Sequence, residues 1–263
     1  LSDFDPYASM VRTEDLQGLN RYMLLLARDL ENKVLKAYED YDFCSIVKSI
    51  ESFCAADLSS FYFDAIKDTL YCDTANSKNR LTVQTTLYRI ARTLIKLSAP
   101  IFCFSMDEAW EYMPKLNKDS DSIHSDNYNL PHISGDEFYD SLLMDKYNAI
   151  RELRKNVNIK LEELRVNKEI GAAYEAEVDI VLPALYFKQP VSAQELKQVM
   201  LVSKVNFSIG NVAVIVKPAN GNQCQRCWSF TNEVGNYSPE DVCSRCADAL
   251  NYVRNLGQKG DET

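Results

Sequence analysis

Residues 223–250 read QCQRCWSFTNEVGNYSPEDVCSRCADAL and place two Cys-x-x-Cys pairs, Cys224/Cys227 and Cys243/Cys246, fifteen residues apart. This is the spacing of structural zinc sites, in which each tight turn aims two thiolates at one metal ion. Two disulfides or four unrelated thiols are the alternative. Four protein ligands complete a tetrahedral shell, so the pattern predicts one structural Zn²⁺ and no catalytic metal. We refer to residues 224–246 as the knuckle.

The residues inside and beside the two pairs add a candidate binding surface. Arg226 lies within the first pair, Arg245 lies within the second, and Trp228 follows Cys227 directly. A flat aromatic ring beside guanidinium groups suits stacking on an unpaired base and pairing with phosphate. The alternative is that Trp228 covers the metal site and that both arginines are solvated.

The composition describes an ordinary globular chain. It has 263 residues, of which 46% are hydrophobic and 25% are charged, enough for two or three units. No apolar run is long enough for a membrane span, and the N-terminus, which starts at Leu1, lacks a signal-peptide pattern. We therefore expect a fragment that begins part-way through a longer, cytoplasmic protein. The net charge of −9 argues against indiscriminate coating of nucleic acid, so a nucleic-acid partner would need local basic patches.

Four cysteines remain outside the knuckle. They fall among apolar positions with helical spacing and are interpreted as small buried hydrophobes in a reducing compartment. These cysteines are Cys44, Cys54, Cys72 and Cys103.

Apolar residues at helical spacing dominate the first two thirds of the chain. They predict helices over 19–38, 42–70, 81–97, 105–113 and 136–168. The fourth helix would begin at Ser105, with Glu108 completing a capping box. Residues 115–135 are interpreted as a polar linker.

The pattern changes after Gly171, where short β-branched runs begin. Strands are predicted over 176–183, 199–205 and 212–217, with a helical turn at 194–198 and a disordered tail after Arg254. The expected fold class is mainly α. It comprises a helical bundle at 1–135, a connecting helix at 136–170, a small α+β unit at 171–220, and the four-cysteine zinc knuckle with its tail at 221–263.

No catalytic residues are predicted. The chain has no glycine-rich phosphate loop, and its two histidines, His124 and His132, both fall in the polar linker. A surface histidine in a loop is the simpler interpretation of each.

Two basic stripes accompany the knuckle. One helix face carries Arg151, Arg154 and Lys155, and the helix at 81–97 carries the second stripe. Such runs are commonly solvated faces, but two of them together with an aromatic knuckle favour an RNA partner. The candidate RNA-contact residues are Arg80, Arg89, Arg92, Lys96, Arg151, Arg154, Lys155, Arg226, Trp228 and Arg245.

Three parts of the chain resemble segments of one known family, and they occur in the same order as in that family. Residues 53–73 (FCAADLSSFYFDAIKDTLYCD), 80–88 (RLTVQTTLY) and 98–110 (SAPIFCFSMDEAW) are similar to the anticodon-binding helical domain of isoleucyl-tRNA synthetases, which are class I enzymes. Residues 167–182 (NKEIGAAYEAEVDIVL) resemble the junction that opens the C-terminal unit. The CQRCW…VCSRC pattern resembles the zinc knuckle that closes the bacterial-type members.

The resemblance implies the tRNA-holding half of an isoleucine–tRNA ligase. The HIGH and KMSKS signatures of class I catalytic domains are absent from this sequence, so ATP would serve only a missing catalytic half. Arginines of the two stripes would contact phosphates, and Trp228 with Arg226 would meet a loop base. The implied partner is isoleucine tRNA, with no DNA and no membrane, and a monomer is expected. A zinc-stapled scaffold for protein interactions is the alternative function.

Overall fold

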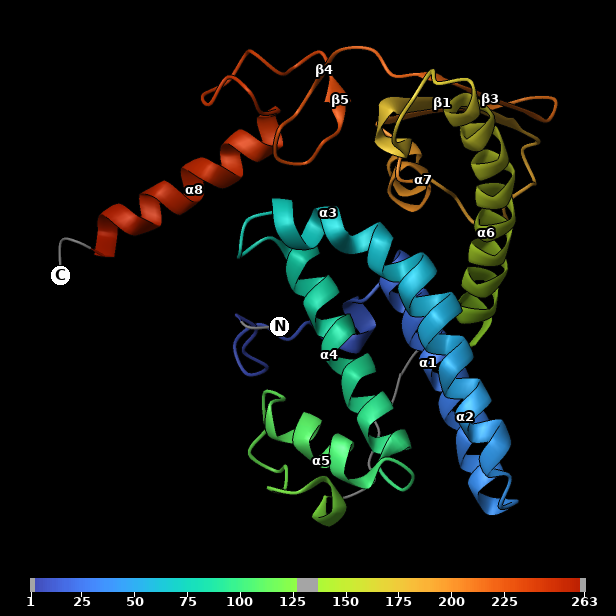
Figure 1. The fold of residues 1–263 in the computed structure, drawn as a ribbon, viewed down its shortest axis with the longest axis vertical. Helices are drawn as coiled ribbons and strands as arrows, with labels where there is room; N and C mark the ends of the chain where they lie inside the picture. Colours follow the sequence, from blue (N-terminus) through green and yellow to red (C-terminus); the bar gives the residue numbers. More distant parts are fainter. Residues whose placement is uncertain (1–2, 127–136, 261–263) are drawn as a thin grey trace. The chain divides into compact units, whose positions relative to one another are not determined.

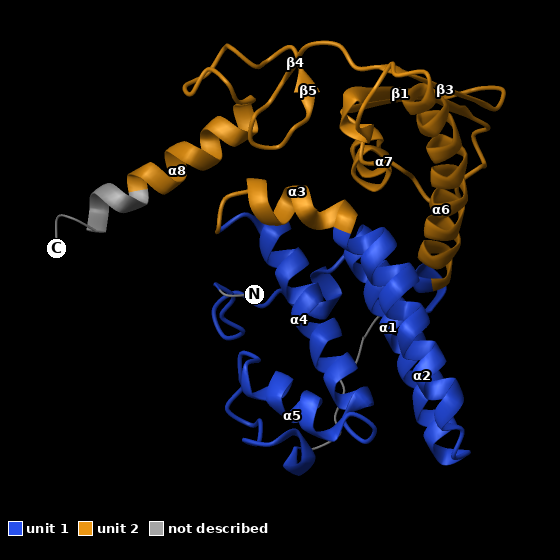
Figure 2. Cartoon of the chain, viewed as in Figure 1, with its two compact units in different colours: residues 1–63, 76–140 blue, residues 64–75, 141–263 orange. Residues whose placement is uncertain are grey.

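The computed structural model describes residues 3–126 and 137–260 of the chain. They form two compact units, coloured separately in Figure 2. Unit 1 comprises Leu1–Phe63 and Asn76–Asp140, and unit 2 comprises Asp64–Ala75 and Ser141–Thr263. Within the described ranges, none of the helices combines the length and the apolar character that crossing a membrane requires.

Unit 1 is helical. It contains α1 (Gly18–Glu39), α2 (Phe43–Ser52), α4 (Lys78–Ser98) and α5 (Cys103–Glu111), with single 3-10 turns at Thr13–Asp15 and Ile123–Ser125. α1 packs against both α2 and α4 (Figure 1). Its buried stripe includes Tyr22, Leu25, Leu30 and Val34, as helical periodicity predicted. The helices predicted over 19–38 and 81–97 are therefore confirmed.

The helix predicted over 42–70 is helical throughout, but it is not one uniform α-helix. Phe53–Phe63, between α2 and α3 (Asp64–Cys72), is π-helical. Hydrogen bonds in a π-helix span five residues instead of the four of an α-helix, so each turn is wider. The buried residues of this segment are Phe53, Leu58, Phe61 and Tyr62.

The predicted start of α5 at Ser105 is wrong. The helix begins at Cys103, and its N-cap residue, Phe102, makes no side-chain capping bond. The N–H groups of Ile101 and Phe102 both donate to the carbonyl of Ser98, so the turn after α4 leads directly into α5. A cap is therefore unnecessary at Ser105.

The described part of the polar linker is folded against unit 1. Asp119 pairs with Arg92, and Asp126 pairs with Lys96. The buried Trp110 donates its Nε1–H to the carbonyl of Ser120 at 3.0 Å. His124 is exposed, while His132 lies outside the described residues.

Unit 2 combines α3, most of α6 (Glu137–Val166), α7 (Ala193–Met200) and α8 (Ser244–Gly260) with a small sheet. The sheet has the order β2-β1-β3. The central strand β1 (Ala176–Leu182) pairs in parallel with β2 (Lys204–Ile209) and antiparallel with β3 (Ala213–Pro218). α7 provides the crossover that a parallel β1–β2 pair requires.

Two predictions in unit 2 need correction. The strand predicted over 199–205 begins only at Lys204, because Val199 and Met200 complete α7 with Leu196 at helical spacing. Leu201 then ends the helix in a left-handed conformation with φ of 61°. The tail after Arg254 continues α8 to Gly260 and is not disordered there.

The cysteines outside the knuckle do not share one environment. Cys72 is buried and Cys54 is partly buried, whereas Cys44 and Cys103 are exposed. The expectation that all four are buried hydrophobes is therefore wrong for the last two.

Candidate metal centre and nucleic-acid interface

The first cysteine pair lies in a hairpin between β4 (Asn222–Gln223) and β5 (Phe230–Thr231). The N–H of Cys224 donates to the carbonyl of Ser229 at 3.0 Å, and the N–H of Trp228 donates to the carbonyl of Cys224 at 2.8 Å. Gly221 enters this hairpin with φ of 99°, and a Cβ there would lie 2.5 Å from the carbonyl carbon of Thr231. Glycine is therefore required for the close approach of the two strands.

The second pair lies at the start of α8. Cys243 immediately precedes the helix and Cys246 falls in its first turn. The N–H of Cys243 donates to Sγ of Cys224 at 3.3 Å, which joins the two turns. Helix N-termini favour negative charge, so this position favours thiolate ligands.

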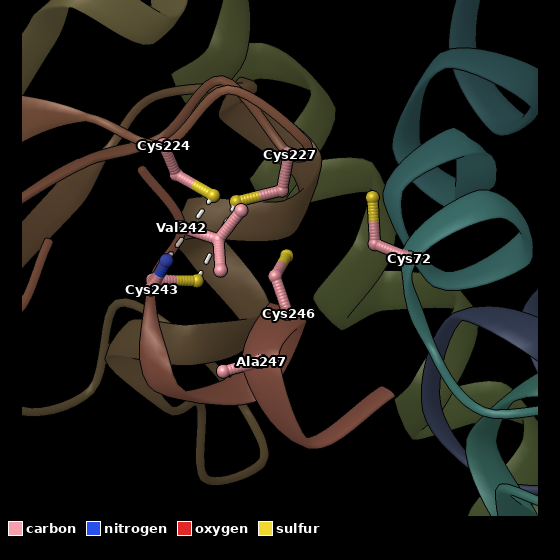
Figure 3. Packing of buried hydrophobic residues seen from close by; sticks show 7 residues of the cluster. All are labelled: Cys72, Cys224, Cys227, Val242, Cys243, Cys246 and Ala247. Atoms are coloured by element: carbon pink, nitrogen blue, oxygen red, sulfur yellow. Dashed lines mark hydrogen bonds between the residues drawn. The ribbon is translucent and has the colours of Figure 1, made fainter. Parts of the chain in front are cut away.

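The four sulfur atoms converge on one point, as Figure 3 shows. All four lie within 4.8 Å of one another and all four residues are buried. The Sγ atoms of Cys227 and Cys243 are 3.8 Å apart. Zinc–sulfur bonds of about 2.3 Å in a tetrahedron separate the sulfurs by roughly 3.8 Å, whereas a disulfide joins them at about 2.05 Å. The cluster thus has the geometry to hold one metal ion and excludes disulfides between these residues.

Without a metal, the pKa values of Cys227, Cys243 and Cys246 are raised above that of a free thiol. The hydrogen bond with Cys246, followed by burial, raises the pKa of Cys227 to about 12. A metal ion that binds here must therefore displace protons, which makes its binding pH-dependent.

Both arginines of the knuckle contact the end of α3, within unit 2. Arg226 donates from Nη1 to the carbonyl of Cys72 at 2.5 Å and from Nη2 to the carbonyl of Tyr71 at 3.0 Å. Arg245 donates from Nη1 and Nη2 to the two carboxylate oxygens of Asp68, each at 2.6 Å. The bonds from Arg226 satisfy carbonyls that the last helical turn leaves without intrahelical partners.

Cys72 also belongs to this contact. It is buried in the same cluster as the four candidate ligands, together with Val242 and Ala247 (Figure 3). Its Sγ donates to the carbonyl of Arg226 at 3.7 Å. Sequence reasoning missed both Cys72 and Asp68 as neighbours of the knuckle. The sequence held one signal for this contact. Each Cys-x-x-Cys turn contains an arginine and no acidic residue, so each arginine needed an acceptor from elsewhere in the chain.

Trp228 stands out from this packing. Its side chain is 62% exposed, and its backbone has a left-handed φ of 62°. Its chain neighbours Cys227 and Ser229 line a cleft of about 610 Å³ together with residues that include Lys197 and Lys204, whereas Trp228 does not line it. The lining also includes Arg245 and the carboxylates of Asp68, Glu177 and Glu233, so the cleft is polar without an excess of positive charge. The exposed aromatic ring of Trp228 can itself stack on a planar ligand.

Comparison with known proteins identifies the family. Residues 20–180 match the family described as the anticodon-binding domain of tRNA ligases. The chain belongs to this family.

The similar proteins share one name. Proteins named isoleucine–tRNA ligase from Neisseria meningitidis, Chromobacterium violaceum and Geobacillus kaustophilus are 38%, 38% and 36% identical to this chain. The alignments cover 99%, 95% and 95% of this chain, and 28%, 27% and 28% of the relatives. The chain thus spans a little over a quarter of the length of the curated relatives it matches. The alignment that covers 99% of the chain includes the knuckle, which lies beyond the residues matched by the family model.

On α4, the predicted basic stripe is engaged in contacts within unit 1. Arg80 pairs with Asp3 at 2.7 Å, while Arg92 and Lys96 are buried in ion pairs. Arg89 is partly buried, and burial lowers its pKa. The structure therefore gives α4 cations partners in their own chain, and their contact with tRNA stays a prediction.

On α6, the stripe is more accessible. Arg151 and Arg154 are partly buried, and burial lowers the pKa of Arg154. Lys155 is exposed and pairs with Glu152 at 2.6 Å. An exposed pair of this kind is weak, so Lys155 can exchange its partner for a phosphate at little cost.

Proposed function

We propose that this chain is the tRNA-recognition part of an isoleucine–tRNA ligase. It binds the anticodon stem-loop of isoleucine tRNA and holds that end of the molecule in register. The observation that carries the proposal is the anticodon-binding family match over residues 20–180, joined to relatives named isoleucine–tRNA ligase that align along 99% of the chain. We propose a cytoplasmic location and no catalytic role for the residues described above, with ATP-dependent ligation carried out by a longer protein containing this chain.

We assign the phosphate contacts first to α6. Arg151, Arg154 and Lys155 lie at helical spacing on one face, so they can follow one strand of an RNA stem. A phosphate contact by Arg92 or Lys96 would require opening a buried ion pair. Phosphate contacts fix the position of the RNA, but they do not read its sequence.

We assign a base contact to Trp228. Anticodon bases are unpaired, so a protein can splay them out and stack them on an exposed aromatic ring, whatever their identity. The adjacent cleft provides lysines and side-chain amides, including Asn220 and Asn232, for hydrogen bonds to base edges and phosphate. Arg226 lies two residues away and keeps its guanidinium on the carbonyls at the end of α3.

We propose that the knuckle holds one Zn²⁺. Four thiolates form the soft, tetrahedral donor set that zinc takes in structural sites, and the distance of 3.8 Å between Cys227 and Cys243 fits it. The ion would tie the hairpin to the start of α8. With four protein ligands it has no position for substrate, so its contribution is to folding.

A salt-titrated binding assay tests the function. The zinc-loaded chain is titrated with isoleucine tRNA and with a variant in which the anticodon is exchanged. We expect tighter binding to the first and an affinity for both that falls as salt rises. Equal affinities would contradict anticodon recognition by this chain, and a salt-insensitive affinity would favour the protein-scaffold alternative.

A further inference from the structure

Each Cys-x-x-Cys turn carries one arginine, and both arginines reach the same helix end. Arg226 binds the last carbonyls of α3, and Arg245 binds the carboxylate of Asp68 one turn earlier. Asp73, just past the helix, lies 3.4 Å from Nη1 of Arg245. The knuckle therefore docks on α3 through charged and polar groups. We call these contacts, which Arg226 and Arg245 make with residues 68 and 71–73, the seat of the knuckle.

The seat matters because the knuckle has little apolar core of its own. Its buried cluster consists of the four candidate ligands with Val242, Ala247 and Cys72, and Cys72 comes from α3. A metal ion fixes the two turns to each other, but it leaves their orientation on α3 to the contacts outside the shell. The two-pronged pair of Arg245 with Asp68 is the most directional of these contacts.

We propose that Arg245 is a positioning residue. Through Asp68 it seats the knuckle on α3 and thereby fixes the place at which the exposed Trp228 meets a bound RNA. This inference rests on the proposed function for its RNA readout, but the seat itself is tested independently. It reassigns Arg245 from an RNA contact to a contact within the chain.

The two roles of Arg245 predict opposite effects for removal of its partner. If Arg245 bound phosphate, Asp68→Ala would remove a competing negative charge and strengthen RNA binding. If Arg245 positions the knuckle, Asp68→Ala weakens binding as much as Arg245→Ala does. The slope of affinity against salt then stays unchanged, because no phosphate contact is lost.

The experiment measures four variants of the zinc-loaded chain: Arg245→Ala, Asp68→Ala, the double variant, and the charge exchange of Arg245→Asp with Asp68→Arg. Lys67→Ala is the matched control, since Lys67 is an exposed cation on the same helix that pairs with Asp64. Each variant is titrated with isoleucine tRNA over a range of salt. Zinc content and hydrogen exchange of the amides in 68–73 and 226–228 are measured on the same samples.

We expect each single variant to weaken binding about tenfold, and the double variant to be no worse than either. The charge exchange should restore most of the loss. Exchange in 68–73 and 226–228 should accelerate in the single variants while zinc content stays constant. The Lys67→Ala control should match the wild type in every measurement.

Tighter binding by Asp68→Ala would overturn the proposal, as would a salt slope lowered by about one in Arg245→Ala. If the wild type shows no salt-dependent binding of tRNA, the proposed function fails. Hydrogen exchange then tests whether the Arg245–Asp68 pair holds the knuckle on α3. Faster exchange in both single variants supports this role, and unchanged exchange overturns it.

Discussion

Arg92 donates two hydrogen bonds to Asp119, from Nη1 to Oδ2 at 2.6 Å and from Nη2 to Oδ1 at 2.7 Å, with both side chains buried. The guanidinium also lies over the ring of Trp110, at 4.5 Å from its centroid. This arrangement fastens the segment after α5 to the middle of α4. In unit 1, a cation that the sequence marked as an RNA contact thus supports the fold.

Asp119→Asn should destabilise unit 1 in a pH-dependent way. Burial opposes ionisation of Asp119, but the bonds from Arg92 and from the Leu116 N–H outweigh it and lower the pKa of Asp119. A lowered folded-state pKa gives stability that is present above the unfolded pKa and is lost as pH falls through the folded pKa. We expect a loss of about 3 kcal/mol at pH 7 that shrinks below about pH 4.

Denaturant unfolding of both proteins across this pH range checks the prediction. Asp121→Asn, which changes an exposed carboxylate in the same segment, is the control. A difference between wild type and Asp119→Asn that stays constant down to pH 3 would show that the ionised carboxylate is not the source of the stability.

Removing a phosphate contact on α6 should reduce the salt dependence of tRNA binding. For Lys155→Ala and for Arg151→Ala we expect weaker binding to any tRNA sequence and a slope smaller by about one. Lys188→Ala is the matched control, because Lys188 is exposed and pairs with Asp145 at 2.6 Å, as Lys155 does with Glu152. Identical slopes for Lys155→Ala and Lys188→Ala would remove α6 from the RNA surface.

Loss of one candidate ligand should release the metal. We expect about one zinc ion per chain in the wild type and none in Cys243→Ser, with the knuckle becoming sensitive to protease because structural zinc contributes roughly 10–16 kcal/mol in finger peptides. Cys44→Ser, which changes an exposed cysteine outside the cluster, should retain the ion. Elemental analysis and limited proteolysis provide the readouts, and a full zinc content in Cys243→Ser would refute the four-cysteine site.

Trp228→Ala separates base stacking from a cover over the metal. Because the ring is 62% exposed, its removal should change the free energy of unfolding by no more than about 0.5 kcal/mol. tRNA binding should lose about 1–3 kcal/mol, and Trp228→Phe should recover part of it. Tyr237→Ala, which removes another exposed aromatic of unit 2, is the control for nonspecific effects. A large loss of stability or of zinc in Trp228→Ala would instead favour the covering role.

The sequence was sufficient for features with a local cause. The apolar stripe of 19–38 predicted α1, and the cysteine spacing predicted the cluster of four sulfurs. It was insufficient where strand and helix patterns overlap. The β-branched residues around Val199 and Met200 suggested a strand, although these two residues complete α7. The contact of Arg245 with Asp68 joins residues 177 positions apart, and no local pattern carries that information.

That separation also has a consequence for the order of events during synthesis. Asp68 leaves the ribosome 177 residues before Arg245, an interval of about 10 to 35 s at ordinary elongation rates. Throughout this interval water must solvate the Asp68 carboxylate and the last carbonyls of α3, which the two knuckle arginines bind in the folded chain. Unit 2 is therefore completed last, when the second cysteine pair emerges and can take up its metal. A nascent chain stalled before residue 243 would hold an unfinished seat for the knuckle.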